Sequence, residues 1–295
     1  MKITTKVILG VFAVLAASSC KSQYDTLLSS NDVDTKYKAA FDYFNKGKYQ
    51  KSAALFESMS VLTDGTERDD TVQYYWGLSN YRYKDYVTAE ANFNRFVNNF
   101  PRSPFAEEAR FLRIDCLYKS TYRYELDQAP TKVAIASINE YEKDYGSNLH
   151  KDDCDAMLKD LNGRLDRKAF EGARLYYNME DYMAARVAFR NTLKANSENI
   201  YREDILYYIA KSSYKYAQLS IASKQRDRYL TFMDDYLNFM SENPQSKYSK
   251  ELKTLYNRAQ KVLGHYTGTD EDADVKEKVF EKERKAAEKA DKKSR

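Results

Sequence analysis

A short stretch near the middle of the chain gathers side chains that could bind a metal: His150, Asp152, Asp153, Cys154 and Asp155. Imidazole, thiolate and carboxylate groups are the usual ligands of zinc and related metals. Carboxylates are also what the positive end of a helix dipole favours, and the chain has only two histidines. We therefore expect a helix to begin here, with no metal or other cofactor.

The residue types needed for catalysis are otherwise scarce or badly spaced. Beyond His150 and His265 there is no histidine, and the sequence contains no glycine-rich phosphate loop, nucleophile elbow or histidine-containing triad. Adjacent carboxylates such as Glu107 and Glu108 do not face each other on a helix, so a solvated surface is their simpler interpretation. The sequence predicts a binding protein and not an enzyme.

Cys20 is the cysteine with a clear chemical role. Lys2 and Lys6 precede an apolar stretch over residues 7–17, which is too short to cross a ~30 Å hydrocarbon core as a helix, so the layout is that of a signal peptide. Residues 15–20, LAASSC, resemble a bacterial lipobox, whose cysteine is acylated after cleavage. Several acyl chains, at about 0.8 kcal/mol per buried methylene, hold a protein on a bilayer. We predict a lipoprotein signal peptide at residues 1–19 and lipid on Cys20; an ordinary signal peptide with an incidental cysteine is the alternative.

Two further cysteines, Cys116 and Cys154, would be exported with the chain to a compartment where disulfides can form. Cys116 lies in an apolar helical run, whereas Cys154 lies at a charged helix start. We expect a buried single thiol at Cys116. A Cys116–Cys154 bridge stays open as the alternative, because the sequence does not supply the Cα separation.

Composition narrows the fold and the class of partner. Without Lys2 and Lys6 the net charge falls from +4 to about +2, and nothing in this balance requires nucleic acid. The chain has 9 Gly and 4 Pro, too few for the many turns of an all-β domain of this length. Long helices joined by short turns fit better.

The elements that position these residues repeat along the chain. Four tyrosines are each followed seven positions later by an aromatic residue and preceded nine positions earlier by a small residue. The tyrosines are Tyr49, Tyr86, Tyr182 and Tyr229, the aromatic residues Phe56, Phe93, Phe189 and Tyr236, and the small residues Ala40, Gly77, Ala173 and Ser220. Small residues on one helix let a second helix approach closely, and the aromatic residues fill the space between successive pairs.

This pattern resembles the tetratricopeptide repeat, and Pro101 stands where that repeat places its helix-ending proline. The wide gap between Tyr86 and Tyr182 implies a degenerate unit at residues 104–124 and 131–145, and the later units need long first helices. We predict an all-α fold: a right-handed superhelical solenoid of about five tetratricopeptide-like helix pairs at residues 34–263, with residues 246–263 as a C-terminal capping helix.

The two ends of the chain differ from the repeats. Residues 20–33 have the character of a lipidated tether. Residues 264–295 are dominated by charged side chains, with Val275, Val279 and Phe280 as the larger apolar groups of the last part. Such a segment cannot bury a face, so we expect a charged tail that is disordered or an isolated helix.

Tyrosine is abundant, with 27 residues. Most are expected in the repeat core, but tyrosines also line peptide-binding grooves, because the ring contributes contact area while ordering only two torsions. First helices line the concave face in this architecture. The predicted groove residues on the first helices of units one and two are Tyr37, Tyr43, Phe44, Tyr74, Tyr75 and Tyr81.

Two stretches make the resemblance more specific. Residues 99–104, NFPRSP, followed by residues 109–113, ARFLR, are similar to the linker and following helix of the BamD family, the lipoprotein subunits of the outer-membrane β-barrel assembly machine. Residues 165–177, LDRKAFEGARLYY, resemble the long helix that leads into the family's fourth unit. The resemblance covers most of residues 33–263.

The resemblance implies a scaffold at the periplasmic face of the outer membrane. Its first repeats would bind unfolded outer-membrane proteins, and its last repeats would dock the POTRA domains of the barrel-forming subunit. Two alternatives remain: a SusD-like glycan- or nutrient-binding lipoprotein, although this chain has a single Trp and few loop residues, and a tetratricopeptide coordinator of cell-wall or division machinery.

Overall fold

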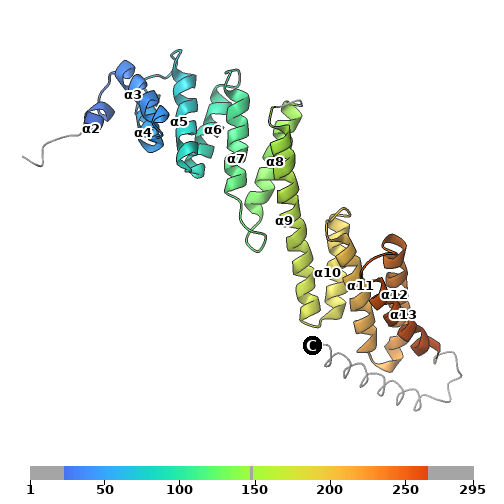
Figure 1. The fold of residues 1–295 in the computed structure, drawn as a ribbon. Helices are drawn as coiled ribbons and strands as arrows, with labels where there is room; N and C mark the ends of the chain where they lie inside the picture. The colour runs from blue at the N-terminus through green and yellow to red at the C-terminus, as the bar shows by residue number, and fades with distance from the viewer. Residues whose placement is uncertain (1–22, 147–148, 265–295) are drawn as a thin grey trace, which may run out of the picture. The chain divides into compact units, whose positions relative to one another are not determined.

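The computed structural model describes residues 23–146 and 149–264, and all regular secondary structure in these residues is α-helical (Figure 1). The predicted all-α class is confirmed. The predicted signal peptide, Cys20 and the charged tail after residue 264 lie outside the described residues. Within those residues, no helix combines the length and the apolar character needed to cross a membrane.

The helices form two compact units. Unit 1 ends at residue 158 and unit 2 begins at residue 159, except that residues 123–126 belong to unit 2. The long helix α9 (Lys151–Asn178) contributes its first part to unit 1 and its remainder to unit 2. The predicted solenoid therefore contains two bodies, each of which has its own packing.

Unit 1 is a series of antiparallel helix pairs preceded by one short helix. Its helices are α2 (Gln23–Leu28), α3 (Val33–Asn45), α4 (Tyr49–Ser60), α5 (Asp69–Tyr83), α6 (Tyr86–Asn99), α7 (Ala106–Lys119) and α8 (Ala129–Asp144). Helix α3 pairs with α4, α5 with α6, and α7 with α8. The degenerate unit expected between the second and fourth repeats is thus the α7–α8 pair.

Local chemistry explains where these helices begin and how closely they pack. Asp85 caps α6, because its side chain accepts a hydrogen bond from the Thr88 backbone amide at 3.1 Å. Gly77 on α5 faces α6: a Cβ added there would lie 2.9 Å from the Phe93 ring. The small residue of the repeat therefore sets the close approach of the second helix, as the sequence pattern predicted.

Within the predicted tether, residues 23–28 form the short helix α2, which packs on the first repeat. Tyr24 donates a hydrogen bond to the Lys51 carbonyl at 3.1 Å and meets the Tyr43 ring edge-on at 5.5 Å, while Leu27 and Leu28 join the apolar cluster of α3 and α4. Partial burial of these three side chains against the first repeat stabilises the segment.

Unit 2 contains the rest of α9 together with α10 (Tyr182–Ala195), α11 (Arg202–Gln218), α12 (Ala222–Glu242) and α13 (Ser249–Gly264). Asp181 caps α10 by accepting from the Ala184 amide at 3.0 Å, the counterpart of Asp85 in unit 1. One apolar cluster runs from Phe170 to Val262 and joins all five helices. Helix α13 closes this cluster, in the place predicted for the capping helix.

The predicted repeat spacing is wrong at the last unit. Tyr49, Tyr86 and Tyr182 each begin their helix, but Tyr229 lies seven residues inside α12, which starts at Ala222. Ser220, the expected small residue of the first helix, instead lies between α11 and α12. Helix α12 begins two turns before Tyr229, after Ile221, whose backbone is extended as is typical of an N-cap residue.

Candidate partner-binding surfaces

The predicted groove residues lie on α3 and α5, and they differ in exposure and in the side chains that they contact. Phe44 and Tyr75 meet edge-on at 5.4 Å, and Tyr75 meets Tyr74 at the same distance. Tyr74 is only 6% exposed and stacks on Phe105 at 4.5 Å, and this burial raises the pKa of its hydroxyl. Tyr74 is therefore a core residue, whereas Tyr75 and Phe44 keep part of their rings exposed.

Tyr37 and Tyr43 lie toward opposite ends of α3. Tyr37 packs on Phe41 at 4.9 Å, and the Arg68 guanidinium lies 5.0 Å from its ring centroid. Tyr43 instead contacts Tyr24 of α2. Both rings are partly exposed, and Phe41 connects Tyr37 to Tyr75, because the Phe41 and Tyr75 ring centroids lie 4.6 Å apart.

Tyr81 belongs to a polar contact between α5 and α7. Its hydroxyl donates to Asp115 Oδ2 at 2.6 Å and accepts from Lys119 Nζ at 3.0 Å, and Lys119 also pairs with Asp115. Burial and the hydrogen bond to Asp115 raise the pKa of Tyr81. The residue holds neighbouring repeats together and offers only part of its ring to a partner.

The metal-like stretch at the start of α9 is built into the packing of unit 1. The His150 ring stacks on Phe111 at 3.6 Å between centroids, and its Nε2 lies 2.8 Å from Glu108 Oε2. Cys154 is fully buried, although the carboxylates beside it in the sequence are exposed. No set of three possible metal ligands converges anywhere in the described residues.

Cys116 and Cys154 are both buried free thiols. Burial raises the pKa of Cys116 to about 12 and that of Cys154 to about 11. At neutral pH both are therefore protonated and weak nucleophiles. The single buried thiol expected at Cys116 is confirmed, and the open alternative of a bridge is not what the structure contains.

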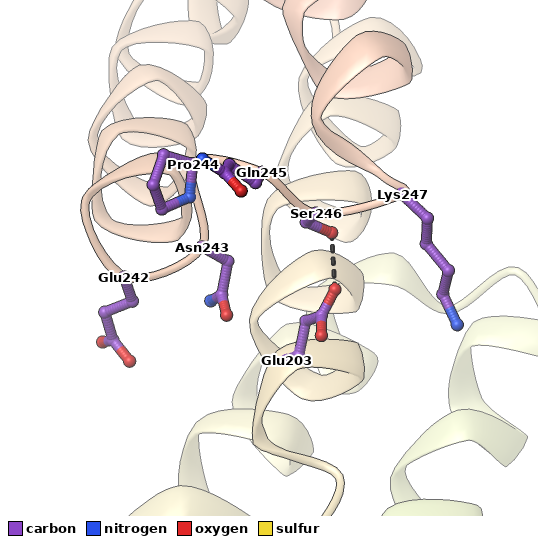
Figure 2. Close-up of a pocket in the computed structure, with 7 residues that line it drawn as sticks. All are labelled: Glu203, Glu242, Asn243, Pro244, Gln245, Ser246 and Lys247. Carbon is purple, nitrogen blue, oxygen red and sulfur yellow. Dashed lines mark hydrogen bonds between the residues drawn. The ribbon is translucent and has the colours of Figure 1, made fainter.

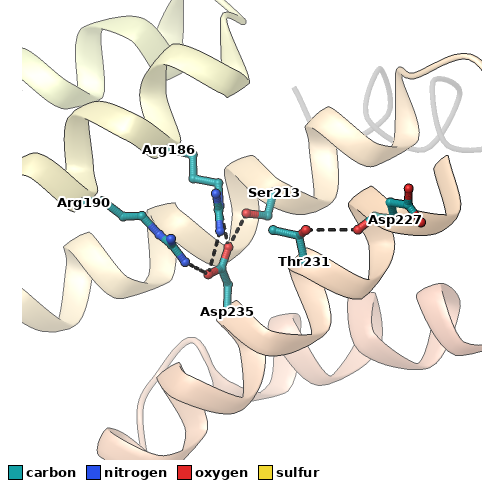
Figure 3. A network of polar contacts seen from close by, with 6 residues as sticks. All are labelled: Arg186, Arg190, Ser213, Asp227, Thr231 and Asp235. Atoms are coloured by element: carbon teal, nitrogen blue, oxygen red, sulfur yellow. Dashed lines mark hydrogen bonds and ion pairs between the residues drawn. The ribbon is translucent and has the colours of Figure 1, made fainter. Parts of the chain in front are cut away.

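Unit 2 contains a buried ion network that joins three helices (Figure 3). Arg186 on α10 donates to Asp235 Oδ2 at 2.7 Å and Arg190 donates to Oδ1 at 2.7 Å, while Ser213 on α11 donates to the same carboxylate. The Asp235 side chain is only 4% exposed. Arg190, in contrast, is 54% exposed, so its guanidinium is held in place by a buried anion while remaining accessible to a partner.

Unit 2 also exposes several large apolar side chains. Met183 and Val187 lie one turn apart on α10, and the Tyr216 hydroxyl of α11 contacts the Met183 sulfur at 3.5 Å. Met179 precedes α10, and Ile221 in the turn after α11 is 69% exposed. The sequence did not predict that Met183 and Val187 are exposed, because apolar residues four positions apart on a helix are also typical of a buried face.

Each unit also has a polar hollow at its turns. In unit 2, seven residues line a hollow between the start of α11 and the turn that joins α12 to α13, where Ser246 donates to Glu203 Oε1 at 2.6 Å (Figure 2). In unit 1, the loops that precede α5 and α7 line another, where Ser103 donates to Asp70 Oδ2 at 2.8 Å. These hydrogen bonds stabilise helix ends, and both hollows are open surface features.

Stacked helix pairs with aromatic first helices and exposed apolar side chains define a helical-repeat scaffold, a class of protein that binds other chains along its helices. Residues 30–230 match the model of the YfiO family, described as outer membrane lipoprotein, so the chain belongs to this family. The predicted resemblance to the BamD family is confirmed by two relatives.

The first relative is the outer membrane protein assembly factor BamD of Caulobacter vibrioides, 20% identical over 203 residues, which are 68% of this chain and 67% of that protein. The second is a putative outer membrane protein assembly factor BamD of Aquifex aeolicus, 25% identical over 253 residues, 85% of this chain and 80% of that protein. Among solved structures, the TPR2AB-domain:pHSP90-complex of yeast Sti1 covers 77% of this chain and 98% of that chain, with 14% identity and a TM-score of 0.37.

Proposed function

We propose that this protein is a non-enzymatic, lipid-anchored scaffold at the periplasmic face of the outer membrane, where it acts in the β-barrel assembly machine. The family match over residues 30–230, with relatives named as outer membrane protein assembly factors, carries this proposal. Unit 1 binds unfolded outer-membrane proteins, and unit 2 docks the POTRA domains of the barrel-forming subunit.

The partly exposed rings on α3 and α5 support the role of unit 1. An unfolded barrel strand alternates apolar and polar side chains, so it needs separate apolar contacts along its length. Tyr37, Phe44 and Tyr75 supply such contacts at low entropic cost. Tyr74 is excluded as a direct contact by its burial.

The exposed apolar residues and Arg190 support the role of unit 2. Methionine, tyrosine and arginine are enriched at the centres of protein interfaces. Met183→Glu should place a charge in this surface and lower co-purification of the barrel-forming subunit at least tenfold. The matched control is Val87→Glu on α6 of unit 1, which is also exposed and should leave co-purification unchanged. Equal loss in both variants would argue against this docking surface.

Depletion tests the function as a whole. If the protein is a barrel assembly factor, many unrelated β-barrel proteins should become less abundant together, as quantitative proteomics of outer membranes would show. Normal barrel levels after depletion would exclude the assignment. Protease treatment of intact cells should leave a periplasm-facing protein uncut, whereas a surface nutrient receptor would be cleaved.

The proposed anchor is tested by Cys20→Ser. The variant should keep its helical content and melting temperature, because position 20 precedes the described helices, but it should leave the membrane fraction or remain unprocessed. A Cys20→Ser protein that is still cleaved before residue 20 and still sediments with membranes would show that protein contacts, not lipid, supply the attachment.

A further inference from the structure

Charge is separated between the two ends of the helices in unit 1. Helices α5 and α7 each begin with acidic residues and end with basic ones, an order that the helix dipole favours. Because the helices pair antiparallel, the turns α5–α6 and α7–α8 lie at the same end (Figure 1). We call this the basic end of unit 1; it carries Lys46, Lys48, Lys51, Arg82, Lys84 and Lys119.

The cations of this end outnumber its carboxylates. Asp42 pairs with Lys46 at 2.7 Å and Asp115 pairs with Lys119, while Asp85 and Asp127 accept hydrogen bonds from backbone amides at the starts of α6 and α8, and Asp25 lies on α2. Four exposed cations remain. Within the part of the chain that the structure describes, no ion pair involves Lys48, Lys51, Arg82 or Lys84.

Aromatic side chains are interleaved with these cations. Lys51 Nζ lies 4.9 Å from the Tyr24 ring centroid and 5.6 Å from that of Tyr43, and Lys48 lies 5.9 Å from Tyr43. Tyr83, next to Lys84, is 50% exposed. Tyrosine and lysine together suit the boundary between headgroups and acyl chains, because both have an apolar body and a polar tip.

The start of the described chain lies at this end. Helix α2 is attached there by the hydrogen bond from Tyr24 to the Lys51 carbonyl. Gln23 is three positions after Cys20, so even a fully extended chain spans only about 10 Å between them. Lipid on Cys20 would thus hold the basic end about one Debye length from a bilayer surface, close enough for electrostatic attraction.

We propose that the basic end of unit 1 is a membrane-contact surface that binds anionic phospholipid headgroups. The inference rests on the proposed lipid anchor for its geometry, and it adds a second attachment that orients unit 1 against the bilayer. The acyl chains on Cys20 would hold the protein on the bilayer, and a basic surface close to them would add attraction to anionic headgroups.

Vesicle binding without the anchor tests this surface by itself. The probe is the chain from residue 20 onward carrying Cys20→Ser, sedimented with phosphatidylcholine vesicles that contain or lack phosphatidylglycerol. We expect binding only with phosphatidylglycerol. Since each lysine near an anionic surface contributes roughly a fivefold factor, Lys48→Gln/Lys51→Gln/Lys84→Gln should lower the partition coefficient on the order of a hundredfold.

The matched control removes three exposed lysines from unit 2: Lys250→Gln/Lys253→Gln/Lys261→Gln on α13. Circular dichroism should show unchanged helicity in both triple variants. Equal loss of binding in both would mean that net charge, not the basic end, drives the attraction, and equal binding to vesicles without phosphatidylglycerol would also overturn the proposal. This assay measures lipid binding alone, whereas the assembly function is tested by the abundance of β-barrel proteins. Failure of one test therefore does not imply failure of the other.

Discussion

Unit 1 and unit 2 are built from the same kind of helix pair, but their cores are organised differently. In unit 1, one apolar cluster that contains Phe56 joins α2, α3, α4 and α5, a second that contains Phe93 joins α5, α6 and α7, and Tyr75 packs against both. In unit 2, a single cluster extends from Phe170 to Val262, and the buried Asp235 joins three of its helices. The destabilisation caused by a core substitution should therefore stay local in unit 1 and extend to all helices of unit 2.

The largest test of this comparison is a pair of core deletions. Phe189→Ala and Phe93→Ala each remove a fully buried ring and should each cost about 4 kcal/mol. Native-state hydrogen exchange should show loss of protection from α10 through α13 for Phe189→Ala. For Phe93→Ala the loss should be confined to α5, α6 and α7. Loss of protection in every helix of both units would contradict the proposed difference between their cores.

The ion network is the next test. Asp235→Ala removes the shared carboxylate from two arginines and Ser213, and should destabilise unit 2 by about 3 kcal/mol. Urea unfolding followed by circular dichroism measures the change. Asp234→Ala is the control, because this neighbouring carboxylate is exposed and its loss should have little effect. Equal effects of the two variants would show that the ion network does not contribute to the stability of unit 2.

Two glycines test how tightly the helices approach. Gly77→Ala in unit 1 forces a methyl group to within 2.9 Å of the buried Phe93 ring, so it should destabilise by about 2 kcal/mol. Gly172 on α9 of unit 2 has open space around it, so Gly172→Ala should stabilise by roughly 0.5–1 kcal/mol through helix propensity. Melting temperatures should move in opposite directions, and a stabilising Gly77→Ala would show that the ring can yield.

The smallest expected effect should be the same in both units. Asp85→Ala and Asp181→Ala each remove a helix N-cap and should each cost about 1 kcal/mol, because a cap is a local interaction. The Asn variants, which can still cap, should retain most of the stability in thermal unfolding. Markedly unequal costs would mean that capping also depends on the core of each unit.

Local patterns predicted the helices well. The spacing from Gly77 to Phe93 indicated a close helix pair, and Tyr86 and Tyr182 begin helices because a capping Asp stands before each. The frame was wrong at Tyr229, where a tyrosine at the right spacing lies inside α12. Helix α2 was missed because a six-residue segment with three apolar side chains has too weak a pattern to predict packing.

The sequence by itself determined which residues are helical, where most helices begin and which families of repeat the chain resembles, because caps and periodicity act over a few residues. Only the tertiary structure decided that Tyr74 is buried while its neighbour Tyr75 is partly exposed. It also decided that Asp235 meets Arg186, 49 residues earlier. Contacts of this kind depend on which helix covers which face, and that is set by packing between distant segments of the chain.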